Sequence, residues 1–342
     1  MSKVITEKPK IKLSLFVAVL LLAIIAGSGW QLYNSKFQPV DASDKSYHDI
    51  IIPANSTARQ IAEILHGNNL IHSQRAFLSY CKKQGLDSSL MAGHYRFSRS
   101  QPLADIATAI ATGRVVTISF TVPEGYTVKQ IGDLLVSKNI VTREGWDQAV
   151  AANYDYMFLQ GLPSGEKGLE GFLFPDTYII SEDTSAWQII DAMLSQFEVL
   201  WQKEFAALAK NRGQSINEAV TIASLIEEEA RVSGERSIIS GVIYNRLQRD
   251  MLLQIDATIL YCLPKHQEVV YYRDLEVDNP YNTYLYPGLP PGPITNPGKE
   301  SIEAALKPDK HNYLYYVSKG DGSHQFTETY AQHLAARRQY ID

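Results

Sequence analysis

Cysteine, clustered histidine and glycine-rich phosphate loops are scarce or missing in this sequence. The two cysteines, Cys81 and Cys262, each lack a second cysteine nearby, which excludes a disulfide scaffold and a cysteine-rich metal site. A single bridge between them and a pair of free thiols are both open. The eight histidines are scattered without ligand spacing, and no nucleotide-binding glycine loop occurs. We therefore expect neither a metal ion nor another cofactor.

An excess of positive charge is also missing. The 342 residues carry a formal net charge of −5 and contain no basic stripe, which argues against nucleic acid as a partner. The hydrophobic share of 45% and the aromatic share of 10% are those of a folded chain, so intrinsic disorder is excluded. This length is enough for two or three compact domains.

The N-terminal region contains a long apolar run. No charged side chain occurs over 13–33, and about 20 apolar residues suffice to cross a bilayer as a helix. Four lysines precede the run, and Trp30 and Tyr33 lie near its end, as at the two faces of a membrane. We predict a cytoplasmic segment 1–12, a transmembrane helix and an extracytoplasmic remainder on a bacterial inner (plasma) membrane. A cleaved signal peptide, with a weak site at 26–28, is the alternative.

Residues 52–65 and 122–135 repeat one pattern. Each copy has an apolar end, a turn with proline, a threonine and then apolar residues at helical spacing. The pattern predicts that Thr57 and Thr127 cap two helices. The residues expected to face the core are Ile61, Ile64 and Leu65 in the first copy and Ile131, Leu134 and Leu135 in the second.

The first copy follows a polar tether at 34–45 and resembles a LysM-like unit. This small α/β module commonly binds N-acetylglucosamine-containing glycans in bacteria. We therefore predict a LysM-like domain at 46–118 and assign the second copy to the next domain, 119–342. Glycan contact by the first copy and simple packing against its neighbour are both open.

A helix with three consecutive glutamates is predicted from Ser215 onward. Ser215 and Glu218 match a capping box, and the helical pattern continues to Glu229. The positions three, four and seven residues before Glu229 are all apolar, unlike those before Glu227 and Glu228. A carboxyl in such a place loses solvation, so its pKa rises and it can hold a proton at neutral pH as a general acid. A solvated helix end is the alternative.

Further polar and aromatic residues follow this helix. A second helix is predicted to carry Asn245, and the stretch after it contains Gln254 and Asp256. Tyr281 and Asn282 precede a proline-rich loop. Its prolines restrict the backbone angle φ, so we expect a rigid, exposed loop of the kind that can form the wall of a cleft. Tyrosine rings and asparagine amides suit sugar faces and hydroxyls, so we regard these residues as candidates for a carbohydrate site.

The remaining pattern predicts an α+β fold. Helical segments are expected over 144–210, interrupted by an apolar strand-like piece with a turn at 169–178. After the proline-rich loop at 287–298, a helix is expected at about 298–307. A last helix is expected to begin near Thr329.

These motifs together resemble the endolytic murein transglycosylase family, the MltG or YceG-like proteins. The resemblance covers the anchor, the LysM-like region and a mixed α+β catalytic domain. This chain departs from the family at Glu228, where lysine is usual, and at Ala257, where proline is usual. The motifs that carry the resemblance are 169–178 (LEGFLFPDTY), 223–229 (ASLIEEE), 245–247 (NRL), 253–256 (LQID), 281–284 (YNTY) and 288–294 (GLPPGPI).

The resemblance implies that Glu229 is the catalytic acid of a lytic transglycosylase. Such an enzyme cleaves the β-1,4 bond between N-acetylmuramic acid and N-acetylglucosamine of nascent peptidoglycan without water. It leaves 1,6-anhydro ends and terminates strand elongation. The implied partners are glycan strands, the membrane and peptidoglycan synthases. Candidates for orienting the acid or the sugars are Glu227, Asn245, Gln254, Asp256, Tyr281 and Asn282.

Two other interpretations are open. A peptidoglycan hydrolase would use two carboxylates, with Asp256 as the second group. A non-catalytic scaffold that binds the cell wall would leave the glutamate triplet as a solvated helix end.

Overall fold

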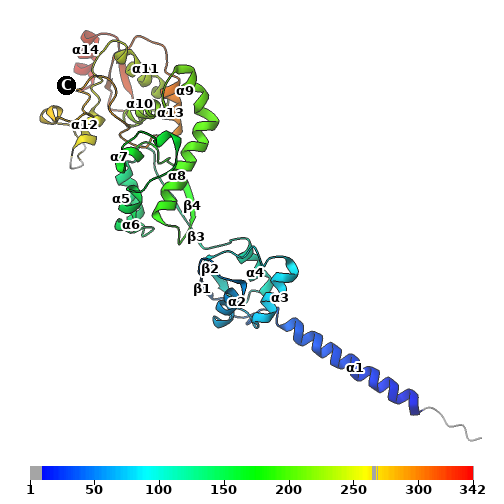
Figure 1. Cartoon of the computed structure of the whole chain (residues 1–342). Coiled ribbons are helices and arrows are strands. Elements are labelled where there is room, and N and C mark those ends of the chain that lie inside the picture. Colours follow the sequence, from blue (N-terminus) through cyan, green and yellow to red (C-terminus); the bar gives the residue numbers. More distant parts are fainter. Residues whose placement is uncertain (1–9, 264–266, 268, 342) are drawn as a thin grey trace, which may run out of the picture. The chain divides into compact units, whose positions relative to one another are not determined.

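The computed structural model describes residues 10–263, 267 and 269–341. Among them the chain forms helices and three separate two-stranded sheets, so the predicted mixture of helices and small sheets is confirmed (Figure 1). The chain divides into two compact units, each with its own hydrophobic core. Unit 1 comprises the described residues up to Ile118 together with Ser181–Asp183, and unit 2 comprises Ser119–Ile180 and the described residues from Thr184 onward.

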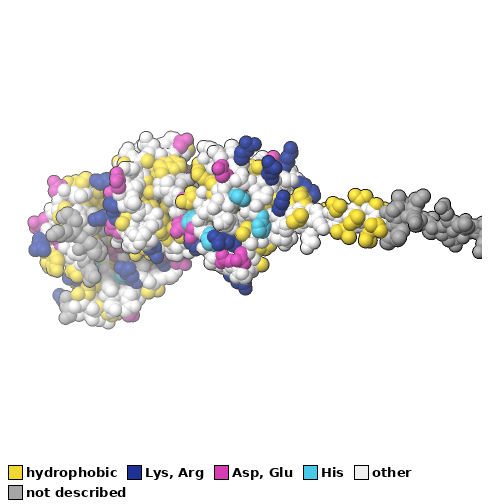
Figure 2. All heavy atoms as spheres, turned by 90° about the horizontal axis from the view of Figure 1, so that it is seen from below, with side chains coloured by type: hydrophobic (Ala, Val, Ile, Leu, Met, Phe, Trp, Pro, Cys, Tyr) yellow, Lys and Arg dark blue, Asp and Glu magenta, His cyan; other side chains and the backbone are white. Residues whose placement is uncertain are grey.

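Helix α1 (Lys10–Ser35) contains the apolar N-terminal run. Its 26 residues give a length of about 39 Å at 1.5 Å per residue. The stretch Val17–Ser35 is apolar and exposed, and by length and composition it could cross a membrane. Figure 2 shows this part of the helix as a hydrophobic surface. Helix α1 thus includes the whole of the predicted helix at 13–33, while its crossing of a membrane stays a prediction.

Unit 1 continues in the order strand, helix, helix, strand, helix. Strands β1 and β2 pair antiparallel, with Tyr47 opposite Ser98. Both strands and all three helices contribute to one core, which includes the fully buried Phe77 and Tyr95. The elements are β1 (Tyr47–Ile52), α2 (Ala58–Gly67), α3 (Gln74–Gln84), β2 (Gly93–Ser98) and α4 (Leu103–Ala111).

The second copy of the repeat builds a similar arrangement. Two strands, β3 and β4, form a two-stranded sheet, and two helices follow the first of them. The elements are β3 (Thr117–Thr121), α5 (Val128–Ser137), α6 (Arg143–Val150), the 3₁₀ turn η1 (Met157–Leu159), the short helix α7 (Glu166–Leu169) and β4 (Thr177–Ser181).

The two copies share their local geometry. Thr57 caps α2 and Thr127 caps α5, each in a capping box with the glutamine three residues later, as predicted. After each helix an asparagine adopts a left-handed backbone, with φ of 54° at Asn69 and 55° at Asn139. Of the predicted core residues, Ile61, Leu65, Ile131 and Leu135 are buried, and Ile64 and Leu134 are half-buried.

The rest of unit 2 is mainly helical and ends in a β-hairpin and a helix. Helices α8 and α9 are joined by a π-helical segment, η2, and α10 packs against α11, α12 and α13. The elements are α8 (Ala186–Leu200), η2 (Trp201–Phe205), α9 (Ala206–Arg212), α10 (Ile216–Glu229), the 3₁₀ turn η3 (Ser233–Glu235), α11 (Arg236–Leu247), α12 (Asp256–Cys262), the 3₁₀ turn η4 (Tyr272–Glu276), α13 (Lys299–Leu306), β5 (Tyr315–Ser318), β6 (His324–Thr327) and α14 (Tyr330–Tyr340).

Most predicted helix boundaries in unit 2 are confirmed. Ser215 and Thr329 are N-caps with capping boxes, and the helix expected at about 298–307 is α13. The strand-like piece at 169–178 is strand only from Thr177 onward. The segment before β4 is irregular because Gly171, with φ of +90°, turns the chain against Pro293 so closely that a Cβ would overlap its ring.

The two cysteines are free thiols. Cys81 lies in unit 1 and Cys262 in unit 2. Burial raises the pKa of each thiol to about 11, so both are protonated at neutral pH. Of the two alternatives, a bridge and free thiols, the structure has the second.

At one packed helix position the first copy of the repeat has alanine and the second has glycine, and this difference allows a test of stability. Gly132 of α5 occupies the place of Ala62 in α2, and a Cβ on Gly132 would lie 2.3 Å from Nε1 of the buried Trp146. We expect Gly132→Ala to lower the free energy of unfolding by about 1–3 kcal/mol through overpacking. Adding Trp146→Phe should recover part of the loss. Thermal unfolding followed by circular dichroism measures both.

Gly67→Ala is the matched control, because nothing lies within 4 Å of the added carbon there. Equal unfolding temperatures for Gly132→Ala and the wild type would contradict the packing described for α5 and α6.

Candidate active site

Glu229 is the last residue of helix α10. The helix begins at the Ser215 cap, and its side chains Ile222, Leu225 and Ile226 are almost completely buried. Glu229 follows these residues on the same face and is half-buried, in agreement with the orientation predicted from its spacing. Its carboxyl therefore lies where the apolar stripe of the helix meets the surface.

The pKa of Glu229 is raised to about 7. Burial is the largest cause, and the negative charges of Asp256 and Glu228 act in the same direction. The polar hydroxyl of the neighbouring Tyr316 and the Arg231 guanidinium favour the carboxylate and lower the pKa. Glu229 also ends its helix, where the helix dipole disfavours negative charge. The carboxyl can therefore both give and take a proton near neutral pH.

Asp256, at the start of helix α12, is close enough to Glu229 for its negative charge to raise the pKa of that carboxyl. Its Oδ1 accepts a hydrogen bond from the Tyr284 hydroxyl. Burial and the bond to Asp256 raise the pKa of Tyr284 above its usual value, so the phenol stays protonated. Asp256 is exposed, which leaves its second oxygen accessible from solvent.

Arg246 contacts Gln254 and lies near Tyr284 and Tyr316, the two tyrosines associated with Asp256 and Glu229. Its buried guanidinium donates to the backbone oxygens of Leu314 and Leu253, and at 3.4 Å to the Gln254 Oε1. The Gln254 backbone is left-handed, with φ of 52°, and its side chain is exposed. Since a non-glycine residue with this backbone is strained, the surrounding contacts must hold it there.

Asn245 and Asn282 use their amides inside the protein. The Asn245 Nδ2 donates to the backbone oxygens of His311 and Tyr313, just before β5. Asn282 is fully buried, and its Nδ2 donates to the backbone oxygens of Leu275 and Val277. In this structure both residues hold backbone segments in place, so a sugar contact through these amide groups would require them to be released.

Tyr281 and Glu227 have partners of their own in unit 2. Tyr281 is buried in the core, where its ring lies 4.9 Å from that of Tyr261. The Glu227 carboxylate accepts a hydrogen bond from the Gly298 amide at 2.9 Å and lies 3.5 Å from the Arg236 guanidinium. It thereby ties the end of α10 to the N-terminus of α13. Of the predicted residues, Glu229, Gln254 and Asp256 are thus brought together, and the others support the surrounding structure.

The sequence analysis missed the side chains that complete this cluster. They are Tyr284, Tyr316, Arg231 and Arg246, which come from the YNTY motif, strand β5 and the ends of helices α10 and α11. Arg246 and Tyr284 lie inside motifs that were recognised. Tyr316 carries no comparable signal, because tyrosines are frequent in this half of the chain.

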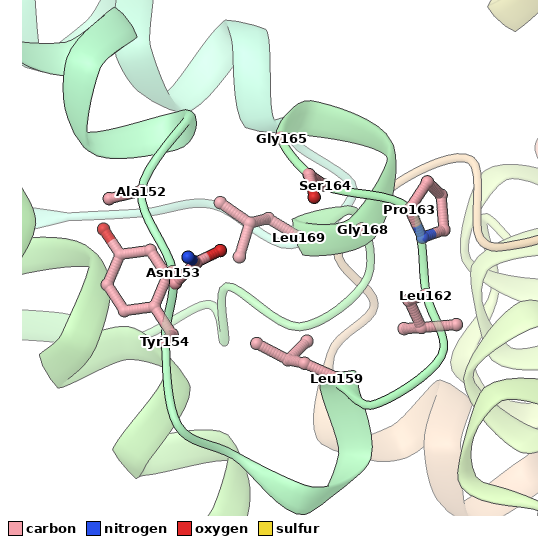
Figure 3. A pocket seen from close by; sticks show the side chains of 10 residues that line it. All are labelled: Ala152, Asn153, Tyr154, Leu159, Leu162, Pro163, Ser164, Gly165, Gly168 and Leu169. Carbon is pink, nitrogen blue, oxygen red and sulfur yellow. The ribbon is translucent and has the colours of Figure 1, made fainter.

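The hollow of about 110 Å³ shown in Figure 3 lies elsewhere in unit 2. Its wall is formed by the loop after α6 and by α7, with Tyr154 and Asn153 on one side and Ser164 on another. None of the predicted site residues lines it. Within the part of the chain that the structure describes, no group of three or more acidic, histidine or cysteine side chains could hold a metal ion.

The charge at position 228 should set the proton affinity of Glu229. The Glu228 carboxylate raises the pKa of Glu229, so Glu228→Gln should lower that pKa from about 7 and Glu228→Lys should lower it further. Carboxyl infrared or NMR titration of the full chain measures the change. An unchanged or higher pKa in Glu228→Lys would contradict the electrostatic assignment. Exchange of the exposed Glu63 for lysine is the control for net charge.

Comparison with known proteins agrees with the recognised motifs. A family model described as the YceG-like family matches residues 50–339. An endolytic murein transglycosylase of Bacillus subtilis is 37% identical over 334 residues, covering 93% of this chain and 91% of that protein. One of Streptococcus pneumoniae is 32% identical over 336 residues, covering 90% of this chain and 60% of that protein.

A solved structure is similar as well. The crystal structure of a YceG-like protein of Listeria monocytogenes matches with a TM-score of 0.57 and 33% identity, covering 85% of this chain and 99% of that one. The family match over most of the chain and the two relatives above 30% identity lead to one conclusion: this chain belongs to the YceG-like family.

Proposed function

We propose that this chain is an endolytic lytic transglycosylase of peptidoglycan. It cleaves the β-1,4 bond between N-acetylmuramic acid and N-acetylglucosamine and leaves a 1,6-anhydro end. The observation that carries the proposal is the half-buried Glu229 carboxyl with a pKa of about 7, beside a group of tyrosine, arginine and glutamine side chains. The names of the relatives, endolytic murein transglycosylase, support the same substrate and reaction class.

Glu229 performs both proton transfers in this proposal. The neutral carboxyl donates its proton to the glycosidic oxygen as the bond to the anomeric carbon of the muramic acid ring breaks. The resulting carboxylate then accepts the proton of the 6-hydroxyl of that ring. The hydroxyl oxygen bonds to the anomeric carbon and closes the anhydro ring. An internal nucleophile needs no bound water and gains from proximity.

The neighbouring charges suit this sequence of steps. The Asp256 carboxylate lies close enough to Glu229 to raise its pKa, so its negative charge also favours the positive charge that develops on the sugar ring. Tyr316 favours the charged form of Glu229 and so supports the carboxylate in the second step. Gln254, oriented by Arg246, presents an exposed amide for a sugar hydroxyl.

A two-carboxylate hydrolase is the second candidate. The same Asp256, exposed and near Glu229, is the observation that favours it. In this case water, rather than the 6-hydroxyl, would attack the anomeric carbon, and the new ends would be reducing sugars. The products therefore separate the two candidates directly.

Helix α1 places this activity at a membrane in our proposal. With its lysine-rich end in the cytosol, α1 spans the inner membrane and leaves the rest of unit 1 and all of unit 2 outside, near emerging glycan strands. The enzyme there terminates strand elongation beside peptidoglycan synthases. The strand, helix, helix, strand order at 47–98 supports a LysM-like domain at 46–118, for which glycan contact and simple packing against its neighbour both stay open.

Replacing the acid tests the catalytic assignment. Glu229→Gln keeps the shape of the side chain and removes the proton, so we expect cleavage of glycan strands by the full chain to fall by a factor of about 10²–10⁴. The wild type should release muropeptides with anhydro ends, identified by mass spectrometry. Glu303→Gln, on the exposed face of α13, is the matched control.

Folding is controlled in the same experiment. Burial disfavours the charged carboxylate of Glu229, so removing that charge should not lower the unfolding temperature of Glu229→Gln at pH 8. An unfolding temperature equal to or above that of the wild type therefore identifies a folded variant. Full activity of this folded variant would overturn the catalytic assignment. Reducing ends in place of anhydro ends would select the hydrolase.

A further inference from the structure

The C-terminal hairpin brings a histidine next to the tyrosine that contacts Glu229. Strands β5 and β6 pair antiparallel, with Tyr316 opposite Phe326 and Ser318 opposite His324. Because side chains alternate along a strand, Tyr316 and His324 lie on the same face of the hairpin. Their ring centroids are 5.3 Å apart and their planes meet at 78°.

Glu235 holds His324 by two bonds. One carboxylate oxygen lies 2.7 Å from the His324 Nδ1, and the other accepts the His324 backbone amide at 3.0 Å. The exposed fractions of the two side chains are 9% for His324 and 13% for Glu235, so water competes little with this pair. The imidazole is fixed in position and in orientation, with Nδ1 as the donor.

Glu235 comes from the segment that directly follows the acid. It ends turn η3, six positions after Glu229, whereas His324 and Tyr316 lie about 90 positions further along the chain. A path of contacts therefore runs from Glu235, six positions after Glu229, through His324 to Tyr316, and the Tyr316 hydroxyl in turn lowers the pKa of Glu229.

We propose that Glu235 and His324 form a positioning pair for the reaction, which holds the Tyr316 ring so that its hydroxyl stays on the Glu229 carboxyl. This inference rests on the proposed role of Glu229. A phenol contacts its partner through one atom at the far end of a rigid ring, so a small tilt of the ring breaks the bond. His324 limits that tilt from the side of the ring.

The charged groups near Glu229 and Tyr316 determine how Glu235 and His324 can affect the pKa of Glu229. Glu229 is faced by Asp256, Glu228 and Arg231 in addition to Tyr316. Tyr316 is faced by Arg246 and Asp256, which do not contact His324 through any hydrogen bond among the described residues. The pair therefore acts on the acid through the Tyr316 hydroxyl, and its loss should resemble the loss of that hydroxyl.

Four variants of the full chain test the proposal: Tyr316→Phe, His324→Phe, Glu235→Gln and the double variant Tyr316→Phe/His324→Phe. Because the Tyr316 bond lowers the pKa of Glu229, its loss should raise that pKa and move the alkaline limb of the pH–rate profile upward. We expect kcat to fall about tenfold or more with KM changed less than about twofold.

The double variant separates positioning from general stability. If His324 acts through Tyr316, His324→Phe should have no further effect on the pH profile in the Tyr316→Phe background. Gln325→Ala, on the opposite face of the hairpin, is the matched control. Glu235→Gln, which keeps an oxygen for the backbone amide, covers the case in which His324→Phe does not fold.

Two results would overturn the inference. One is an unchanged pH profile and unchanged Glu229 pKa in folded His324→Phe and Glu235→Gln, with only a lower unfolding temperature. The other is an additive effect of the two substitutions in the double variant. Failure of the proposed function is a different result, since Glu229→Gln would then keep wild-type activity.

Discussion

The proposed chemistry depends on keeping the Glu229 carboxyl partly out of water at the C-terminal end of a helix. Three consecutive glutamates end α10, and its last turn contains no basic residue, which opposes the helix dipole. The helix tolerates this ending because its cap at Ser215 and its buried apolar face stabilise it along its whole length. Such a local violation of helix rules is consistent with the proposed catalytic role of Glu229.

Features set by neighbours in the sequence could be predicted. The caps at Thr57, Thr127 and Ser215 depend on three or four adjacent residues, and helical spacing alone oriented Glu229 toward the apolar side. The repeat was visible for the same reason, since each copy encodes its own turn, cap and asparagine. These short-range rules predicted helix α10 and the half-buried position of Glu229 at its end.

Features set by distant segments could not be predicted. Asn245 has the side chain of a sugar ligand, yet its Nδ2 donates to the backbone oxygens of His311 and Tyr313, more than sixty positions later. Tyr316 affects the pKa of Glu229 from strand β5, almost ninety positions later in the sequence. The strand expected at 169–178 failed because Gly171 turns against Pro293, which lies more than a hundred positions later. The partner of a polar group is decided by tertiary contacts.

The left-handed backbone of Gln254 limits which residues could replace it. Glycine would relax the chain at this point, but it would leave the Arg246 guanidinium without its amide partner. Asparagine tolerates the same backbone better, although its shorter arm would not reach as far. A substitution at position 254 therefore exchanges backbone strain against side-chain length. Glutamine accepts the strained backbone and has a side chain long enough to contact Arg246.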